Sequence, residues 1–363
     1  MTHRGFYKFG GGEKMGLLKA DSIIFLIGAG CSADAKIKTS GQKIDEIETL
    51  IKNEDEWKFY RQLYYYVKSA ILYADGIQEN FENNMNVERL VGVLRDLKKN
   101  ERNPIYPFIG SWNEKLIELG GIGFSNIDKF DRLLSEKIVD FVTLHSDTAS
   151  RVSYHKKFYE FQTSIQFPIR MFSLNYDQCI EKAKPNDYEL ECGFDESNEW
   201  LAERFGNQTQ ANAGIFLYKL HGSIDWVRNS DTGLLKRFDS PQKNAELIFG
   251  TDAKLQSIDP FLFIVHELRN YSLLCKMIVI IGYSFNDAHI NGLLGQALRS
   301  AERKLLVVDA RDNYSSEILK KLSLDDSFTG RIEYKKMTAS DFLKNELTKE
   351  KMELLIPDDD AVF

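Results

Sequence analysis

The chain has 363 residues, of which 43% are hydrophobic and 28% are charged, a composition typical of a globular protein rather than a disordered one. At roughly 150 residues per domain, this length predicts two structural units, or one domain with a large insertion. The net charge of −7 argues against a broad surface for the phosphate backbone, so direct nucleic-acid binding is not expected.

Targeting signals and cysteine spacing limit the class of protein further. No apolar run reaches the ~20 residues of a membrane-spanning helix, and the start, MTHRGFYKFGGGEKMG, lacks the apolar core of a secretory signal. None of the four cysteines, Cys31, Cys179, Cys192 and Cys275, forms a C-x-x-C pair, which argues against a structural zinc site. We therefore expect a cytoplasmic protein with reduced thiols, no zinc and no membrane contact.

The first predicted element is a buried strand that runs into a glycine turn. Ile23–Ile27 is a continuous apolar run, typical of a strand covered on both faces of a parallel sheet. Gly28 and Gly30 end it, and Ser32 follows as a candidate helix cap. Glycines let the backbone approach a ligand, and a helix N-terminus can bind phosphate. The stretch GAGCS therefore indicates a pyrophosphate site, with a plain strand-to-helix turn as the alternative.

A helical period then replaces the strand pattern over residues 43–165. Five apolar residues of one stretch share a face: Trp57, Tyr60, Tyr64, Val67 and Ile71. The same stripe recurs further on, so this section predicts an all-helical insertion of roughly 120 residues. We expect it to interrupt one α/β domain made of residues 21–42 and 166–350, with an N-terminal arm at 1–20 and an acidic tail at 351–363.

Strand-like runs return after the insertion, at 167–175, 215–222, 246–250, 276–284, 304–310 and 331–337. Helical runs at 286–303 and 314–324 separate the last three. Strands that alternate with helices are the pattern of a doubly wound parallel sheet. The predicted fold class is therefore α/β, a Rossmann-like doubly wound sheet with an inserted all-helical module.

Polar residues stand where several of these strands end. Asn175 and Asp177 follow the second strand, and His221 ends the third. Ligands of open α/β sheets bind at this carboxyl edge, where an asparagine suits a ribose hydroxyl and a histidine can act as a general base. The alternatives are a turn and helix cap for Asn175 and Asp177, and a satisfied polar residue for His221.

Two later strand ends carry similar groups. Gly282 breaks the run IVIIG, and Ser284 follows with a hydroxyl that can bind a ribose or a phosphate. Asp309 ends LLVVDA, where a carboxylate can accept both hydroxyls of a ribose. An ordinary cap before a helix is the alternative for Asp309.

The order of these motifs resembles the sirtuin family. The matching residues are Gly28-Ala29-Gly30-Cys31-Ser32, Asn175-x-Asp177, His221-Gly222, Gly282-Tyr283-Ser284 and Asp309. The stretches GYSFNDAHI and LHGSIDW look like the bacterial sirtuin-like branch of anti-phage defence. The resemblance implies a sirtuin-type sheet with NAD⁺ as substrate. It implies that the pyrophosphate is bound by Gly28, Ala29, Gly30 and Ser32, and that Asp177 faces the carboxamide. The adenosine ribose would be bound by Ser284, in the loop of Gly282, and by Asp309, at the end of the next strand.

The departures from the family pattern favour hydrolysis over deacylation. Deacylases follow GAGxS with a glycine, a proline and a Phe-Arg pair, where this chain has Lys36, Lys38, Ser40 and Gly41, and they carry a four-cysteine zinc module. The defence branch cleaves NAD⁺ to nicotinamide and ADP-ribose. The resemblance thus implies an NAD⁺ hydrolase in which Asn175 orients ribose and water and His221 is the general base.

Three other functions stay open or rank lower. A protein deacylase would need an acyl-lysine channel, and a sensor of NAD⁺ or a derivative would not need His221. A dehydrogenase expects a third glycine, where Ala33 stands. Relatives in defence are controlled by assembly or partners. We therefore expect a homo-oligomer and a separate partner, a HerA-type ATPase rather than a short Argonaute.

Overall fold

The structure is a computed structural model that describes residues 18–77, 85–101, 114–206, 213–249, 258–300 and 303–357. Most of the predicted N-terminal arm, residues 1–17, and the end of the predicted acidic tail, residues 358–363, lie outside the described residues. Within the described ranges, no helix combines the length and the apolar character that crossing a bilayer requires.

Seven parallel strands form one sheet, which confirms the predicted α/β fold class. Their order across the sheet is β3-β4-β2-β1-β7-β8-β9. The strands are β1 (Ile23–Ile27), β2 (Ile169–Ser173), β3 (Leu190–Glu191), β4 (Ile215–Lys219), β7 (Met277–Ile281), β8 (Lys304–Asp309) and β9 (Ile332–Lys336). From β1 the chain first builds the sheet in one direction and then, from β7, in the other. The strand order therefore reverses between β1 and β7, the position where open α/β sheets bind ligands.

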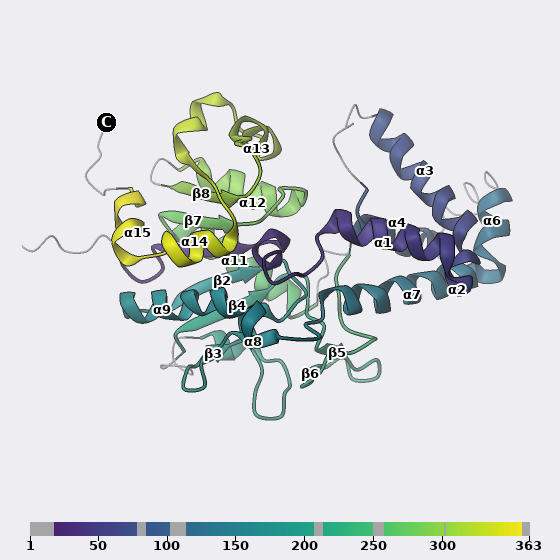
Figure 1. The fold of residues 1–363 in the computed structure, drawn as a ribbon, viewed down its shortest axis with the longest axis horizontal. Coiled ribbons are helices and arrows are strands. Elements are labelled where there is room, and N and C mark those ends of the chain that lie inside the picture. Colours follow the sequence, from purple (N-terminus) through teal and green to yellow (C-terminus); the bar gives the residue numbers. More distant parts are fainter. Residues whose placement is uncertain are drawn as a thin grey trace, which may run out of the picture.

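Helices cover both faces of the sheet, as the strand register shows. Phe25 of β1 contacts Phe158 of α9 (Lys156–Ile165), with ring centroids 5.6 Å apart. The neighbouring β1 residue Leu26 pairs with Phe172 of β2 and points to the opposite face, because side chains alternate along a strand. Phe172 lies near Tyr271 of α11 (Phe261–Leu274), so α9 and α11 lie on opposite faces. Beside α9 run α14 (Ala339–Asn345) and α15 (Lys349–Leu355), as Figure 1 shows.

The described part of the chain between β1 and β2 is mostly helical. It forms α1 (Ser40–Asn53), α2 (Asp55–Lys58), α3 (Arg61–Ile77), α4 (Val87–Glu101), α6 (Glu114–Gly120), α7 (Ser125–Val142) and α8 (Thr148–Arg151) before α9. In Figure 1 the helices α1 to α7 extend to one side of the sheet. The predicted apolar face from Trp57 to Ile71 is buried at all five positions. The exact domain boundaries at 43 and 165 stay predictions.

Two local predictions are wrong. Residues 246–249 form no strand but a single antiparallel bridge between Leu247 and Gly222. Their backbone N–H groups donate to separate places, Glu246 N to Trp226 O and Ile248 N to His221 O, instead of to one strand. Residue 250 lies outside the described residues. Ser32 does not cap an α-helix: it ends a short 3₁₀ turn (Ala29–Ser32), and α1 begins only at Ser40, after Thr39. A hairpin of β5 (Trp226–Arg228) and β6 (Leu235–Arg237) was not predicted, because its strands have only three residues each.

Candidate active site

The register of the central strands brings the predicted site residues to one edge of the sheet. Ile27, the last residue of β1, pairs with Ser173 of β2 and with Ile281 of β7. Ser173 in turn pairs with Lys219 of β4, and Ile281 pairs with Val308 of β8. The five strands thus end within one residue of the same level, and the predicted site residues lie along this edge. Gly28, Asn175, His221 and Gly282 come after their strands, and Asp309 is the last residue of β8.

The two glycine loops at the switch point touch backbone to backbone. Gly28 N donates to Ile281 O and Gly30 N to Gly282 O, both at 2.9 Å. A Cβ on Gly28 would lie 2.5 Å from Gly282 O, and one on Gly282 would lie 2.3 Å from Cys31 N. Gly282 also has a φ of +65°, which side chains disfavour. Glycine is required here by loop-on-loop contact. In the first of these loops, Ala29 and Gly30 are only half-buried.

Asn175 links the second strand end to the first glycine loop. Its Nδ2 donates to Gly28 O at 3.0 Å and to Ser32 Oγ at 3.1 Å, and its backbone N–H donates to Ser173 Oγ. Both amide hydrogens are therefore used within the protein. The amide oxygen is the atom that remains to accept a hydrogen bond from a ligand or water.

Asp177 forms the turn after Asn175 and is tied to β4. Its Oδ1 accepts from Cys179 N at 3.0 Å, at the start of α10 (Cys179–Lys182), as the capping alternative expects. Its backbone carbonyl accepts from the ammonium of Lys219, which also donates to Ser223 Oγ at 2.8 Å. Lys219 is 1% exposed and pairs with Glu181, whose negative charge, against the effect of burial, raises the Lys219 pKa. These contacts join the turn after β2, which carries Asp177, to Lys219 at the end of β4.

His221 has a carboxylate partner from the second glycine loop. Its Nε2 lies 3.4 Å from Asp287 Oδ2, and both residues are only 5% exposed. The other oxygen of Asp287 caps α12 (Ala288–Leu298) by accepting from His289 N and Ile290 N. Because the helix start fixes the carboxylate and the carboxylate holds the ring, Nδ1 is the ring nitrogen left to bind a proton from a ligand.

The pairing of Asp287 with His221 was missed by sequence reasoning. Tyr283 also contributes to this loop. Its hydroxyl donates to Asn291 Oδ1 at 2.9 Å and accepts from Asp287 N at 3.2 Å. His221 and Asp287 are 66 positions apart in sequence, and β2 and β1 separate β4 from β7 in the sheet. The pair is therefore visible only once the loops that follow these two strands are placed in the structure.

Ser284 and Asp309 lie on the far side of the switch point. Ser284 is half-buried in the loop after β7. Asp309 binds Arg311 through both oxygens, at 3.0 and 2.8 Å, and accepts from Tyr314 at 3.2 Å. Burial alone would raise the Asp309 pKa, but the hydrogen bonds from Arg311 outweigh it and lower the pKa below its usual value. Asp309 is thus a charged carboxylate that is already engaged with arginine.

Lys43 is a second residue that sequence reasoning missed. It belongs to α1 and is 4% exposed. Burial lowers its pKa, while the nearby carboxylates of Glu88 and Asp177 act in the opposite direction. The signal was present in the helical period, because Lys43 precedes Ile47 by four residues and so shares its buried face. The structure thereby places a lysine among the buried residues of α1.

The cysteines and metal-binding groups give no sign of a zinc site. All four cysteines are free and buried, and burial raises the pKa of each thiol. In the part of the chain that the structure describes, no three His, Cys, Asp or Glu side chains gather as metal ligands.

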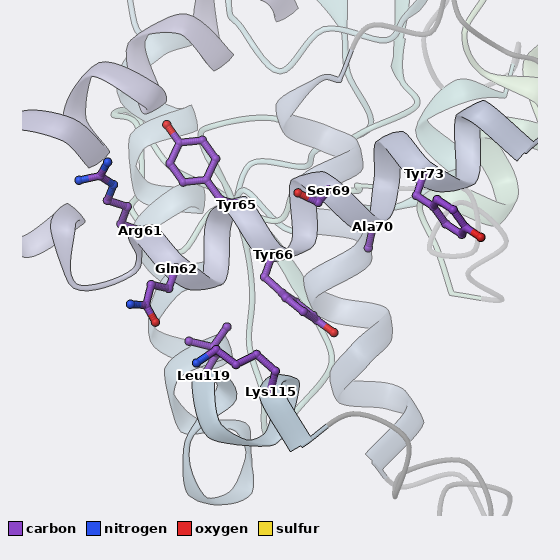
Figure 2. A pocket seen from close by; sticks show the side chains of 9 residues that line it. All are labelled: Arg61, Gln62, Tyr65, Tyr66, Ser69, Ala70, Tyr73, Lys115 and Leu119. Atoms are coloured by element: carbon purple, nitrogen blue, oxygen red, sulfur yellow. The ribbon is translucent and has the colours of Figure 1, made fainter.

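A groove of about 850 Å³ is lined by residues of α3 and α6. Figure 2 shows it between α3 and α6, where Gln62 and Tyr66 of α3 face Lys115 and Leu119 of α6. None of the predicted site residues lines it. The groove belongs to the helical insertion and not to the candidate active site.

Part of the α/β domain is similar to a known protein family. Residues 170–328 match the model of a SIR2-like domain, a range that holds Asn175, His221, Gly282 and Asp309 but not the first glycine loop. A search of the curated proteins finds no match.

The solved structures that resemble this chain include Sir2 homologues. A Sir2 homologue–NAD complex is 13% identical with a TM-score of 0.44, covering 92% of this chain and 90% of that chain. A Sir2 homologue mutant with 2′-O-acetyl-ADP-ribose is 12% identical with a TM-score of 0.45, covering 92% of both chains. The family match is limited to residues 170–328, so this part of the chain is the part that is similar to a SIR2-like domain.

Proposed function

We propose that this protein is an NAD⁺ glycohydrolase that cleaves NAD⁺ to nicotinamide and ADP-ribose. The observation that carries the proposal is the buried pair of His221 and Asp287, 3.4 Å apart, at the same sheet edge as Asn175 and the two glycine loops. The SIR2-like domain over residues 170–328 supports NAD⁺ as the ligand of that edge.

In the proposed reaction the protein mainly has to position the ribose and the attacking water. Nicotinamide is cationic in NAD⁺ and leaves as a neutral molecule with the electron pair of the C–N bond, so no acid is needed. Glycoside cleavage of this kind passes through an oxocarbenium-like state. Water then forms the new C–O bond at the ribose and loses one proton. Holding the ribose and the water in line is the main task of the site.

His221 is the group that takes this proton in the proposed reaction. The Asp287 carboxylate holds the ring through Nε2 and stabilises the positive charge that the imidazole gains, as the aspartate of a catalytic triad does. A positioned base of this type contributes about 10²–10⁴-fold to a rate.

Asn175 orients the ribose and the water in the same proposal. Its Nδ2 is held by Gly28 O and Ser32 Oγ, which points the side chain by two hydrogen bonds and leaves Oδ1 as the acceptor.

The remaining contacts to the dinucleotide are assigned by their place along the edge. Gly28, Ala29, Gly30 and Ser32 would bind the pyrophosphate, and Asp177 would face the carboxamide. Ser284 and Asp309 would bind the adenosine ribose. Because Arg311 occupies both oxygens of Asp309, the ribose hydroxyl has to share an oxygen with Arg311 rather than take the carboxylate alone.

One assay separates this proposal from the two alternatives. The purified chain is incubated with NAD⁺, with and without an acyl-lysine peptide, and free nicotinamide is measured. A hydrolase releases nicotinamide with NAD⁺ alone, whereas a deacylase needs the peptide. A sensor binds NAD⁺ in a calorimeter but releases nothing in either arm, which would refute the proposal.

The proposal also includes a role in anti-phage defence through loss of NAD⁺. A hydrolase that is always active would kill its own cell, so control by a homo-oligomer and by a separate partner is part of the proposal, with a HerA-type ATPase preferred to a short Argonaute. The helical insertion has exposed apolar side chains for such contacts, among them Phe59 and Tyr73, at 67% and 73% exposure. Light scattering and the nicotinamide assay, with and without the candidate ATPase, test this part.

A further inference from the structure

The segment Glu246–Phe249 lies against the backbone of the proposed catalytic histidine. Ile248 N donates to His221 O at 3.0 Å, and Leu247 forms an antiparallel bridge with Gly222. The approach is close, because a Cβ on Gly222 would lie 2.0 Å from Glu246 O. The position of His221 is thus set in part by this segment.

The same segment also contacts the strand end that carries Asn175. The hydroxyl of Tyr176 donates to Ile248 O at 2.8 Å, and the rings of Tyr176 and Phe249 are 5.5 Å apart. Tyr176 and Phe249 are 3% and 1% exposed. Residues 246–249 therefore connect the turn after β2 with the turn after β4, which are the two turns of the proposed chemistry.

Arg95 of the helical insertion holds this segment from the other side. Its Nη1 donates to Leu247 O at 3.3 Å, and its guanidinium carbon lies 4.7 Å from the centre of the Phe249 ring. Its Nε binds Asp131 of α7 at 3.2 Å, and its Nη2 donates to Ser135 Oγ at 3.3 Å. One planar fork thus joins α4, α7 and the segment, in a geometry that a lysine cannot reproduce.

We propose that Arg95 is a positioning residue that couples the helical insertion to His221. The proposal rests on the proposed function, because it concerns the base of that reaction. Arg95 fixes residues 247–249, these fix the backbone at His221, and the side chain of His221 is thereby aligned with Asp287. Any partner that moves α4 or α7 then changes the rate of the reaction through Arg95, without touching the NAD⁺ site.

The test compares Arg95→Ala and Arg95→Lys with a control on the same helix. Lys98 lies one turn further along α4 and also pairs with an aspartate of α7, Asp128. Among the described residues, no hydrogen bond joins Lys98 to the 246–249 segment, so Lys98→Ala weakens the contact between α4 and α7 alone. Nicotinamide release gives kcat and KM for each variant. Amide hydrogen exchange at Ile248, whose N–H binds His221 O, reports the position of the segment directly.

We expect both Arg95 variants to lower kcat by about tenfold or more, since small displacements of reacting groups are costly, with KM for NAD⁺ within about twofold of the wild type. Exchange at Ile248 rises by about tenfold, the effect of losing a local constraint, while Lys98→Ala matches the wild type in both. Arg95→Ala with wild-type exchange at Ile248, or with the same kcat as Lys98→Ala, would overturn the proposal. If the wild type releases no nicotinamide, the proposed function fails, and exchange alone decides whether Arg95 positions the segment.

Discussion

His221 and Asp287 form a buried pair, with Nε2 3.4 Å from Oδ2, although one follows β4 and the other begins α12. The loops that follow β4 and β7 bring them together, although β2 and β1 lie between these two strands in the sheet. A buried carboxylate at a helix start gains stability from the capped N–H groups. The protein therefore holds the ring of His221 with a group that the fold itself fixes in place.

The first prediction concerns the charge of Asp287. Asparagine also caps helices well, so Asp287→Asn should keep α12 intact and remove only the negative charge beside His221. We expect kcat for nicotinamide release to fall by about 10²-fold or more, with circular dichroism unchanged. A variant with wild-type kcat would show that the carboxylate has no part in the reaction.

The second prediction separates the structural role of Asn175 from its proposed catalytic one. Asn175→Ala removes the donor to Ser32 Oγ and one of the two donors to Gly28 O. Gly28 O keeps its bond from Cys31 N, and the loss of the other two bonds should cost about 1–3 kcal/mol of unfolding free energy. Ser32→Ala keeps the bond to Gly28 O and should lose less stability in urea titrations. Equal stabilities for the two variants would contradict the hydrogen-bond geometry at this turn.

The third prediction tests the contact between the glycine loops. Gly282→Ala places a Cβ 2.3 Å from Cys31 N at a φ of +65°, so the unfolding free energy should fall by about 2–4 kcal/mol. Gly292→Ala is the matched control at an exposed position of α12, with no atom within 4 Å of the new Cβ, and should gain about 0.5–1 kcal/mol. Tolerance of Gly282→Ala would mean that the loops do not touch as described.

The fourth prediction is a pH dependence of stability from His155. His155 is fully buried below the first glycine loop, 3.9 Å from Cys31 Sγ, and burial lowers its pKa to about 4. The unfolded chain, with a histidine pKa near 6.5, binds more protons between these values. Stability due to the neutral ring is therefore complete above about pH 6.5 and is lost as the pH falls toward about 4.

A His155→Phe variant provides the comparison for this effect. It lacks the titrating ring, so its unfolding free energy should change less between pH 6.5 and pH 4, by a difference on the order of 2–3 kcal/mol. Parallel pH profiles for the two proteins would show that His155 does not titrate in this range.

Most of the α/β fold was predictable because its signals are local. The runs at Ile23–Ile27 and Met277–Ile281 are apolar over every residue, and a strand buried on both faces has that pattern. The strand predicted over residues 246–250 was wrong because an apolar run indicates that the side chains are buried, but does not indicate which groups the backbone binds. Its N–H and C=O groups bind His221, Tyr176 and Arg95.

The candidate site was predictable only as a set of strand ends. The sequence places Asn175 and His221 after strands, and parallel strands end at one edge of a sheet. It does not show that Asp287 reaches His221, or that Arg95 reaches Leu247 across 152 positions. Such contacts depend on strand order and on the path of the insertion, which no local pattern contains.

The most direct measurement of the central claim is the rate of nicotinamide release by His221→Ala at saturating NAD⁺, relative to the wild type. We expect release by the wild type without any acyl-lysine peptide, and a rate at least about 10²-fold lower for the variant, with NAD⁺ still bound. Release at the wild-type rate by His221→Ala would contradict the account.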